Sequence, residues 1–411
     1  MPEFLELLPP FKALELLFKH LPPAAPETEE ISTRSAAGRV LAIPVVAFEP
    51  LPGFARSTVD GFAVFAADTY GASDSLPVYL SLAGEVAMGR TPDFSLNRTQ
   101  AALIHTGGML PEGADAVVMV ETTQNTRPGE IEVMRALAVG ENILQPGEDV
   151  ASGSEVIPAG TLLRSMEIGG LAALGRMTIQ VAARPRIAIL SSGDEVVSPE
   201  QSPQPGQVRD VNSYTLAALV EKEGGSPVLY GIIRDQRTEL EQAVQRALTE
   251  CDAVVITAGS SASTRDLTAD VIQTMGQPGV LVHGVNVKPG KPTILGVCGG
   301  KAVIGLPGNP VSALVIARIF VVPVIHHLLG MNKSARVAVI SARLTLNLAS
   351  QAGREDWMPV RLLSTARGWE ADPIFYKSNL IFSLVRADGL VHIPADANGL
   401  AAGELVEVEI L

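Results

Sequence analysis

Lys288-Pro289-Gly290-Lys291-Pro292 and, after a short apolar run, Gly305-Leu306-Pro307-Gly308-Asn309-Pro310 are the two turns that decide how this chain folds. Proline fixes φ and glycine permits unusual φ, so both turns have a defined shape. The second turn predicts a helix that begins at Val311. A rigid loop with two lysines, beside the backbone amides of a helix start, suits an anionic ligand such as phosphate.

Composition narrows the possible classes of protein. The chain has 411 residues, which indicates two to four domains. Hydrophobic residues make up 47% and charged residues 18%, enough for well-formed cores and too apolar for extensive disorder. The net charge of -13 and the aromatic content of 4% argue against a nucleic-acid partner. An anionic substrate must therefore be held by a local group of positive charges.

The cysteines, the N-terminus and the most apolar segment carry no sign of secretion or membrane insertion. Cys251 and Cys298 stand outside any metal or redox motif, so neither a disulfide framework nor a zinc site is predicted. The first residues lack the basic region of a signal peptide. The apolar stretch 311–329 contains Arg318 and Pro323, which favours a buried helix over a bilayer span. We expect a soluble, cytoplasmic protein with no membrane partner.

Residues 184–330 alternate between short apolar strands and helices. Strands are expected at 186–190, 227–233 and 253–256, and helices at 213–222, 239–248 and 267–275. This alternation predicts a doubly wound, largely parallel α/β sheet. The segments 53–149 and 335–411 instead show short β runs broken by Gly, Pro and Asn, which indicates a β-rich domain and a terminal β-barrel or sandwich.

Polar clusters follow the predicted strands of the α/β region. They are residues 191–195, 234–235, 257–266, 288–291 and 307–309. In an open α/β sheet the carboxyl ends of the strands form the crevice in which ligands bind. Any one cluster could be a solvated turn, but five at one edge predict a site.

Several carboxylates occupy positions that suit metal or acid–base chemistry. Asp194, Glu195, Asp235 and Asp266 follow strands near the lysine turn, as expected for Mg²⁺ that bridges substrate phosphates. Asp266 could equally cap the helix after it. Outside the α/β region, the turns at Asp60-Gly61, His105-Thr106 and 147–149 end or begin apolar runs, and Asp60-Gly61 could be a simple hairpin turn.

Taken together, these segments resemble the MoeA family, the molybdopterin molybdenumtransferases that are related to the gephyrin E domain. The resemblance is carried by residues 57–63, Thr106-Gly107, 113–118, Gly147-Glu148-Asp149, Ser192-Gly193-Asp194-Glu195 and the two turns quoted first. They occur in the family's order and span nearly the whole chain.

The resemblance implies a fold of the α/β + β multidomain class in a homodimeric subunit. A split linker domain would comprise residues 1–48 plus 150–182, and a β-rich domain residues 49–149. A doubly wound α/β pterin-binding domain would cover 183–332, and a C-terminal β-barrel 333–411. The active site would lie between the α/β domain of one subunit and the β-rich domain of the other.

The implied reaction inserts molybdenum from molybdate into adenylylated molybdopterin and releases AMP with the help of Mg²⁺. A molybdopterin adenylyltransferase would act upstream. The implied catalytic residues are Asp60, Thr106, Asp149, Glu195, Asp235 and Asp266, of which Glu195, Asp235 and Asp266 would hold the metal. The implied substrate-binding residues are Ser192, Gly193, Asp194, Ser261, Lys288, Lys291, Pro307, Gly308, Asn309, Pro310, Arg354 and Ser378.

One loop departs from the family's pattern. Ala258 and Ser263 stand where the family usually has glycine. If the backbone there needs positive φ or a close approach of phosphate, these residues reshape the loop. The alternative to an active transferase is therefore a pterin-binding paralogue with reduced or lost transferase activity. A pure scaffold role ranks last, because no additional tail or linker is visible.

Overall fold

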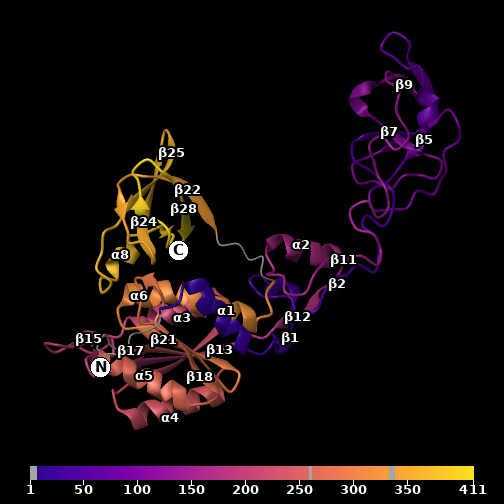
Figure 1. Cartoon of the computed structure of the whole chain (residues 1–411). Coiled ribbons are helices and arrows are strands. Elements are labelled where there is room, and N and C mark those ends of the chain that lie inside the picture. The colour runs from indigo at the N-terminus through magenta and orange to yellow at the C-terminus, as the bar shows by residue number, and fades with distance from the viewer. Residues whose placement is uncertain (1–6, 259–261, 333–337) are drawn as a thin grey trace. The chain divides into compact units, whose positions relative to one another are not determined.

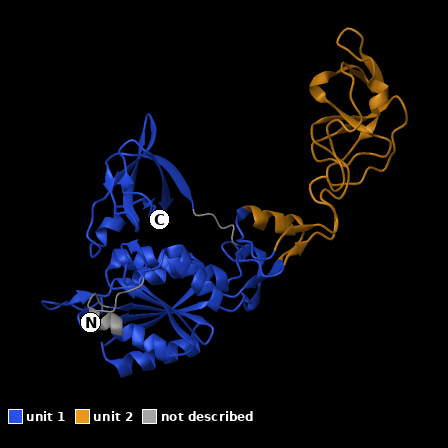
Figure 2. Ribbon diagram, viewed as in Figure 1, with its two compact units in different colours: residues 1–43, 159–165, 178–411 blue, residues 44–158, 166–177 orange. Residues whose placement is uncertain are grey.

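The computed structural model describes residues 7–258, 262–332 and 338–411. Contacts divide the chain into two compact units, coloured separately in Figure 2. The large unit comprises Met1–Ile43, Ala159–Ser165 and Thr178–Leu411, and the small unit comprises Pro44–Pro158 and Met166–Met177. The four-domain division expected from the sequence is finer than this and stays a prediction.

The large unit is built around a six-stranded, mainly parallel sheet (Figure 1). Its strand order is β16 (Ser226–Ile233), β13 (Arg186–Ser192), β17 (Ala253–Ala258), β21 (Lys301–Pro307), β20 (Ile294–Cys298) and β18 (Pro278–His283). The first four strands are parallel, and β20 is antiparallel to both of its neighbours. The doubly wound sheet predicted from the sequence is thus confirmed.

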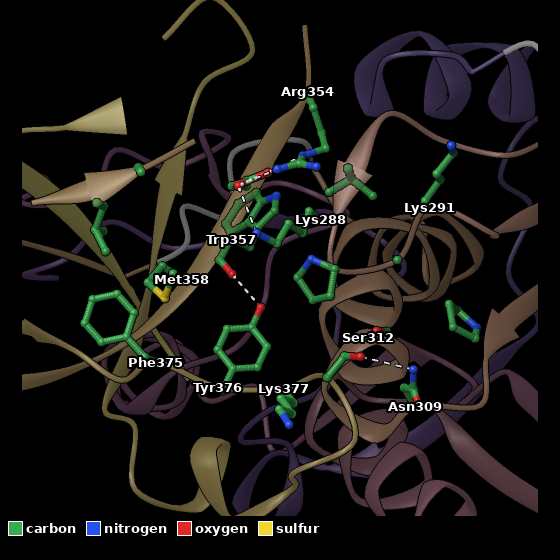
Figure 3. Close-up of a pocket in the computed structure, with 18 of the residues that line it drawn as sticks. Lys288, Lys291, Asn309, Ser312, Arg354, Trp357, Met358, Phe375, Tyr376 and Lys377 are labelled. Carbon is green, nitrogen blue, oxygen red and sulfur yellow. Dashed lines mark hydrogen bonds and ion pairs between the residues drawn. The ribbon is translucent and has the colours of Figure 1, made fainter. Parts of the chain in front are cut away.

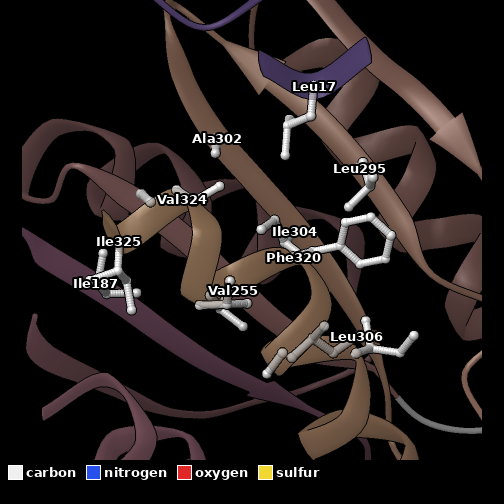
Figure 4. Close-up of a cluster of buried hydrophobic side chains, with 14 of the residues drawn as sticks. Leu17, Ile187, Val255, Leu295, Ala302, Ile304, Leu306, Phe320, Val324 and Ile325 are labelled. Carbon is white, nitrogen blue, oxygen red and sulfur yellow. The ribbon is translucent and has the colours of Figure 1, made fainter. Parts of the chain in front are cut away.

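Alternate residues of the central strands feed two separate cores. In β13, Ile187 and Ile189 belong to one core, while Ala188 and Leu190 belong to the other. The first core, drawn in Figure 4, takes Leu17 and other side chains from α1 (Pro10–His20), α3 (Asn212–Lys222) and the helices after β21. The second takes side chains from α4 (Arg237–Glu250) and α5 (Ala262–Thr274). Strand alternation therefore places helices on both faces of the sheet.

The apolar stretch after the Pro307–Pro310 turn is a helix of the core. It consists of α6 (Pro310–Ile316), a π turn (Ala317–Val321) and α7 (Val322–Leu328). Pro323 offers no N–H to the carbonyl of Ile319, and the helix widens there. Among the described residues this is the one helix with the length and hydropathy of a membrane span, with 56% of its apolar window buried. Phe320 is fully buried against the sheet, as predicted for a core helix (Figure 4).

The C-terminal part of the large unit is a closed β-barrel. Its strands are β24 (Glu355–Thr365), β25 (Gly368–Pro373), β22 (Val339–Leu344), β28 (Leu405–Ile410) and β26 (Gly389–Ile393). The pairing of β26 with β24 closes the ring, which decides between the barrel and the sandwich expected from the sequence. A strand from the α/β region, β19 (Val287–Lys288), pairs with the start of β24. The lysine turn is thereby joined to the barrel as well as to the α/β sheet.

The small unit contains a six-stranded sheet, as predicted for the β-rich segment. Its order is β7 (Ala116–Met119), β4 (Gly61–Val64), β6 (Gln100–Ile104), β5 (Val78–Glu85), β9 (Glu130–Val133) and β8 (Thr123–Arg127). Two short strand pairs also belong to this unit, β3 (Arg56–Ser57) with β10 (Ile143–Leu144) and β2 (Val45–Val46) with β11 (Glu155–Ile157). Most of α2 (Ser165–Ala173) lies in the same unit. The pair β1 (Thr28–Ser32) with β12 (Thr178–Ala182) belongs to the large unit.

Candidate active site

The predicted polar clusters do gather at one edge of the α/β sheet. Since β13, β16, β17 and β21 are parallel, their carboxyl ends lie at a common edge. The loop that carries the two lysines runs from β18 to β20, and β20 starts at the same edge because Ile294 pairs with Gly305. The described backbone of all five clusters lies at this edge, as expected, while residues 259–261 of the third cluster lie outside the described residues.

A cavity of about 750 Å³ opens between the lysine turn and the barrel, and we call it the cation pocket (Figure 3). Four basic side chains line it, namely Lys288, Lys291, Arg354 and Lys377, against one acidic side chain, Asp356. This volume suits a small organic ligand. The excess of positive charge suits an anionic one, even though the chain as a whole is acidic.

Asp356 organises two of the cations. Its carboxylate accepts hydrogen bonds from Arg354 Nε at 2.7 Å and from Arg354 Nη2 at 3.1 Å. Lys288 Nζ lies 3.8 Å from the same carboxylate. The side chain of Asp356 is 5% exposed, whereas that of Lys288 is 58% exposed. A buried anion therefore fixes the fork of the arginine, while the lysine can still reach into the cavity.

Gly290 gives the lysine turn its shape. Its φ is +122°, and a Cβ at this position would lie 2.3 Å from both Cγ1 and Cδ1 of Ile316 in α6. Ile316 is fully buried, so it has no room to move aside. The hydroxyl of Thr293 donates to the carbonyl of Gly290 at 2.6 Å and closes the turn. The glycine singled out in the sequence is thus required by a close approach of backbone to helix.

Aromatic side chains form the wall of the cation pocket on the barrel side. Figure 3 shows Trp357, Phe375 and Tyr376 on one side of the cavity, with Asn309 and Ser312 opposite. The Tyr376 hydroxyl donates to the carbonyl of Trp357 at 3.2 Å. Burial, with a smaller contribution from the charge of Asp356, raises the pKa of Tyr376, so the hydroxyl stays protonated. Flat apolar faces next to cations suit a planar heteroaromatic ligand with anionic groups.

Asn309 and Ser378 tie the barrel to the start of α6. Asn309 Nδ2 donates to Ser378 Oγ at 3.0 Å, and the Val311 N–H donates to the Ser378 carbonyl at 3.1 Å. Both side chains line the cation pocket. The second Pro/Gly turn therefore holds a barrel segment over the helix start.

A second cavity of about 560 Å³ lies beyond Asn309, and we call it the polar pocket. It is lined by Ser191, Ser192, Glu195, Asp210, Asn212 and Thr257 among others. Asp210 accepts the Ser191 hydroxyl at 2.8 Å and caps α3 by accepting the Ser213 N–H at 3.1 Å. Asn212 Nδ2 donates to the Gly308 carbonyl at 2.8 Å, while its Oδ1 is buried and has no partner within the described part of the chain. Asn309 lines both pockets, so one extended ligand could occupy both.

The predicted metal ligands are only partly placed by the structure. Ser192 Oγ donates to Asp235 Oδ1 at 2.6 Å, and the Asp235 N–H donates to Asp194 Oδ1 at 3.3 Å. Glu195 lines the polar pocket. Among the side chains that the structure describes, which do not include that of Asp266, no three histidine, cysteine, aspartate or glutamate residues lie close enough together to hold a metal ion. Carboxylate and hydroxyl oxygens are nevertheless the donor type that Mg²⁺ prefers, so the residues present fit this ion in kind.

Ser261 and the side chain of Asp266 lie outside the described residues. The backbone of α5 begins at Ala262, so Asp266 is the fifth residue of the helix. The alternative expectation that Asp266 caps this helix is therefore wrong, because a cap residue precedes the first helical turn.

The small unit brings Asp60 and Thr106 together. Asp60 Oδ1 accepts the Thr106 N–H at 2.8 Å and its hydroxyl at 3.1 Å. These bonds, the backbone one first, hold the pKa of Asp60 below its ordinary value. The hairpin-turn alternative is wrong, because β3 before Asp60 pairs with β10 while β4 after it pairs with β6 and β7. Asp149 is exposed on its turn, where its N–H donates to the Leu51 carbonyl at 3.0 Å.

Several residues of the site were missed from the sequence. They are Asp356, Trp357, Tyr376, Lys377, Asp210 and Asn212. No sequence pattern identified them; Asp356 lies two residues after the predicted Arg354, but Arg354 precedes β24, so strand alternation does not link the two. The site residues predicted from the sequence line two different pockets. Lys288, Lys291, Arg354 and Ser378 line the cation pocket, and Ser192, Glu195, Gly308 and Pro310 line the polar pocket.

Three family models match the chain over most of its length. Residues 8–175 match the MoeA N-terminal region (domain I and II), residues 188–327 a probable molybdopterin binding domain, and residues 341–411 the MoeA C-terminal region (domain IV). The chain is 32% identical to the molybdopterin molybdenumtransferase of Nostoc sp. over 387 residues, 93% of this chain and 88% of the relative. It is 33% identical over 377 residues to molybdopterin molybdenumtransferase 2 of Mycobacterium tuberculosis, 91% and 92% of the two chains.

A solved structure of a MoeA protein is also similar to this chain over nearly its full length. The molybdopterin biosynthesis MoeA protein of Pyrococcus horikoshii OT3 superposes with a TM-score of 0.86 at 31% identity, over 99% of this chain and 100% of that one. The family models, the relatives of similar length and this solved structure all point to one family. On these grounds the chain belongs to the MoeA family.

Proposed function

We propose that this chain is a transferase of molybdenum cofactor biosynthesis that inserts molybdenum from molybdate into adenylylated molybdopterin and releases AMP. The relatives named molybdopterin molybdenumtransferase support the reaction class. The observation that carries the proposal is the cation pocket, where Lys288, Lys291 and Arg354 meet an aromatic wall. A substrate with a planar pterin and anionic groups matches both features.

The two pockets divide the work. In the cation pocket, Lys288 and Lys291 bind anionic oxygen, Arg354 presents a fixed guanidinium, and the Asn309–Ser378 bridge positions the ligand. Ser192 lines the polar pocket, and we propose that it holds the far end of the substrate together with the adjacent residues Gly193 and Asp194. Charge that develops on transferring oxygens is stabilised by cations already in place, which is the usual basis of such catalysis.

Magnesium would bind on the carboxylate side of the site. Glu195, Asp235 and Asp266 are the proposed ligands. When bound, the ion neutralises phosphate charge and polarises the bond that releases AMP. Ser192, which donates to Asp235, keeps one carboxylate oxygen oriented.

The small unit supplies the remaining proposed catalytic residues, Asp60, Thr106 and Asp149. We propose that they reach the site from the second subunit of a homodimer in the cytoplasm, with the four domains as expected from the sequence. The exposed carboxylate of Asp60 supports this role, because Oδ1 is held in place by the N–H and the hydroxyl of Thr106. A molybdopterin adenylyltransferase is the proposed upstream partner.

The alternative of an inactive paralogue rests on Ala258 and Ser263, and the backbone gives it little support. Ala258 is the last residue of β17 and pairs with Pro307, an extended conformation that any residue adopts. Ser263 lies within the helical backbone of α5. Neither backbone conformation requires a positive φ, so we expect that restoring glycine at both positions leaves the rate of transfer unchanged.

The test is a transfer assay with purified protein, Mg²⁺, molybdate and adenylylated molybdopterin, in which released AMP and active cofactor are both measured. We expect conversion by the wild type, and a loss of about a hundredfold or more in Lys291→Ala, because one cation in a preorganised site contributes on the order of 3 kcal/mol. A folded protein that binds the pterin and converts none of it would refute the proposal.

A further inference from the structure

The strand pairing between β19 and β24 places a carboxylate among the cations of the site. Lys288 is the register partner of Asp356, so the backbone itself brings a lysine of the α/β loop beside a barrel aspartate. Glu355 N–H donates to the Asn286 carbonyl at 3.1 Å, and Asn286 Nδ2 donates to the Gly353 carbonyl, so two further hydrogen bonds join the two segments just before the pair. Backbone pairing therefore sets the separation of Lys288 and Asp356, and the flexible lysine side chain only adjusts it.

Asp356 has the charged partners and hydrogen bonds that a buried carboxylate needs. A buried carboxylate is stable only when charged partners and hydrogen bonds replace water. Here Arg354 supplies two parallel bonds and Lys288 a second charge. The two-bond fork fixes the plane of the guanidinium and leaves its other N–H groups to point elsewhere.

We infer that Asp356 is the positioning residue of the cation pocket: it orients Arg354, restrains Lys288 and limits the net positive charge that a substrate anion meets. This inference rests on the proposed function of the same site. Without Asp356 the pocket would hold four cations and no counter-charge. It would then attract any small anion more strongly while orienting each less well, so selectivity would fall together with turnover.

Two variants separate charge from shape. Asp356→Asn keeps the size of the side chain and removes its charge, whereas Asp356→Glu keeps the charge and moves it by one methylene. Asp372→Asn is the matched control, because Asp372 lies in the same barrel and accepts its 2.6 Å hydrogen bond from the neutral hydroxyl of Thr345.

The first readout is the affinity for molybdate, and separately for inorganic phosphate, by calorimetric titration of the full-length protein at several concentrations of NaCl. We expect the affinity of Asp356→Asn to fall more steeply with salt than that of the wild type, because the net charge of the pocket rises by one and chloride competes better. Asp356→Glu and Asp372→Asn should keep the wild-type salt dependence. A protein with a merely weakened barrel would show the wild-type salt dependence and a lower melting temperature.

The second readout is the transfer rate, in which kcat of Asp356→Asn should fall about tenfold or more, with partial recovery in Asp356→Glu. Unchanged kcat and unchanged salt dependence in Asp356→Asn would overturn the inference, as would a wild type that binds neither molybdate nor phosphate. A wild type that performs no transfer, but whose molybdate affinity responds to Asp356→Asn as described, would refute the proposed function and support the role of Asp356.

Discussion

Replacing Gly290 with alanine should disrupt the turn that carries Lys288 and Lys291. The new Cβ would lie 2.3 Å from two atoms of Ile316, which is fully buried. Forcing a methyl group into a packed core costs about 1–3 kcal/mol, and a non-glycine residue at positive φ costs about 1 kcal/mol more. We expect the free energy of unfolding of the large unit to fall by about 2–4 kcal/mol, and molybdate affinity to fall with it.

A double-mutant cycle in urea unfolding, followed by circular dichroism, isolates the steric part. Ile316→Ala removes both clashing atoms, so Gly290→Ala in that background should cost only the backbone contribution of about 1 kcal/mol. Gly299→Ala is the matched control, because Gly299 also has positive φ, at +58°, but has open space around its Cβ position. Equal costs of Gly290→Ala in both backgrounds would refute the steric argument. A wild-type stability for the single variant would refute the geometry of the turn.

Three further predictions concern other parts of the chain. Glu223→Gln should lower the free energy of unfolding by about 1–2 kcal/mol at pH 7. The hydrogen bond from His326 lowers the pKa of Glu223, so this stabilisation is complete above the ordinary value of 4.5 and is lost as the pH falls through the lowered folded value. In urea titrations the difference between variant and wild type should therefore be smaller at pH 3 than at pH 7, and a difference that persists unchanged would contradict this prediction. Cys298 should resist alkylation in the native protein at pH 8 and react once urea unfolds the chain, because burial raises the pKa of its thiol to about 11. Fast labelling of the folded protein would contradict this prediction. Asp60→Asn should reduce transfer at least about tenfold with little change in melting temperature, since the residue is exposed and asparagine can still accept from Thr106; a large loss of stability would instead mark a structural role.

The α/β region could be predicted well because its local patterns and its tertiary structure agree. The middles of β13 and β17 are continuous apolar runs, polar residues follow at their carboxyl ends, and parallel pairing puts those ends at one edge of the sheet. The helix after Pro310 was likewise marked by proline at its first position. In these segments each local preference pointed to the same structure.

The organisation of the site was harder to predict, because it depends on pairing between distant segments. No local pattern indicates that β19, only two residues long, leaves the α/β sheet to join β24 of the barrel. That pairing brings Asp356 to Lys288 and so decides the charge of the cation pocket. The start of α5 was missed for a different reason: 257–266 is rich in small and polar residues, which suggest a loop although Ala262 already begins the helix.

The account depends most on the claim that the turns at 288–292 and 305–310 bind the anionic end of the substrate. A crystal structure of the protein with adenylylated molybdopterin and tungstate tests this directly, because tungsten can be located by its anomalous scattering. We predict the oxyanion or a substrate phosphate in the cation pocket, with oxygen atoms about 3 Å from Lys288 Nζ or Lys291 Nζ. A well-ordered substrate bound elsewhere, with both lysines left in solvent, would contradict the account.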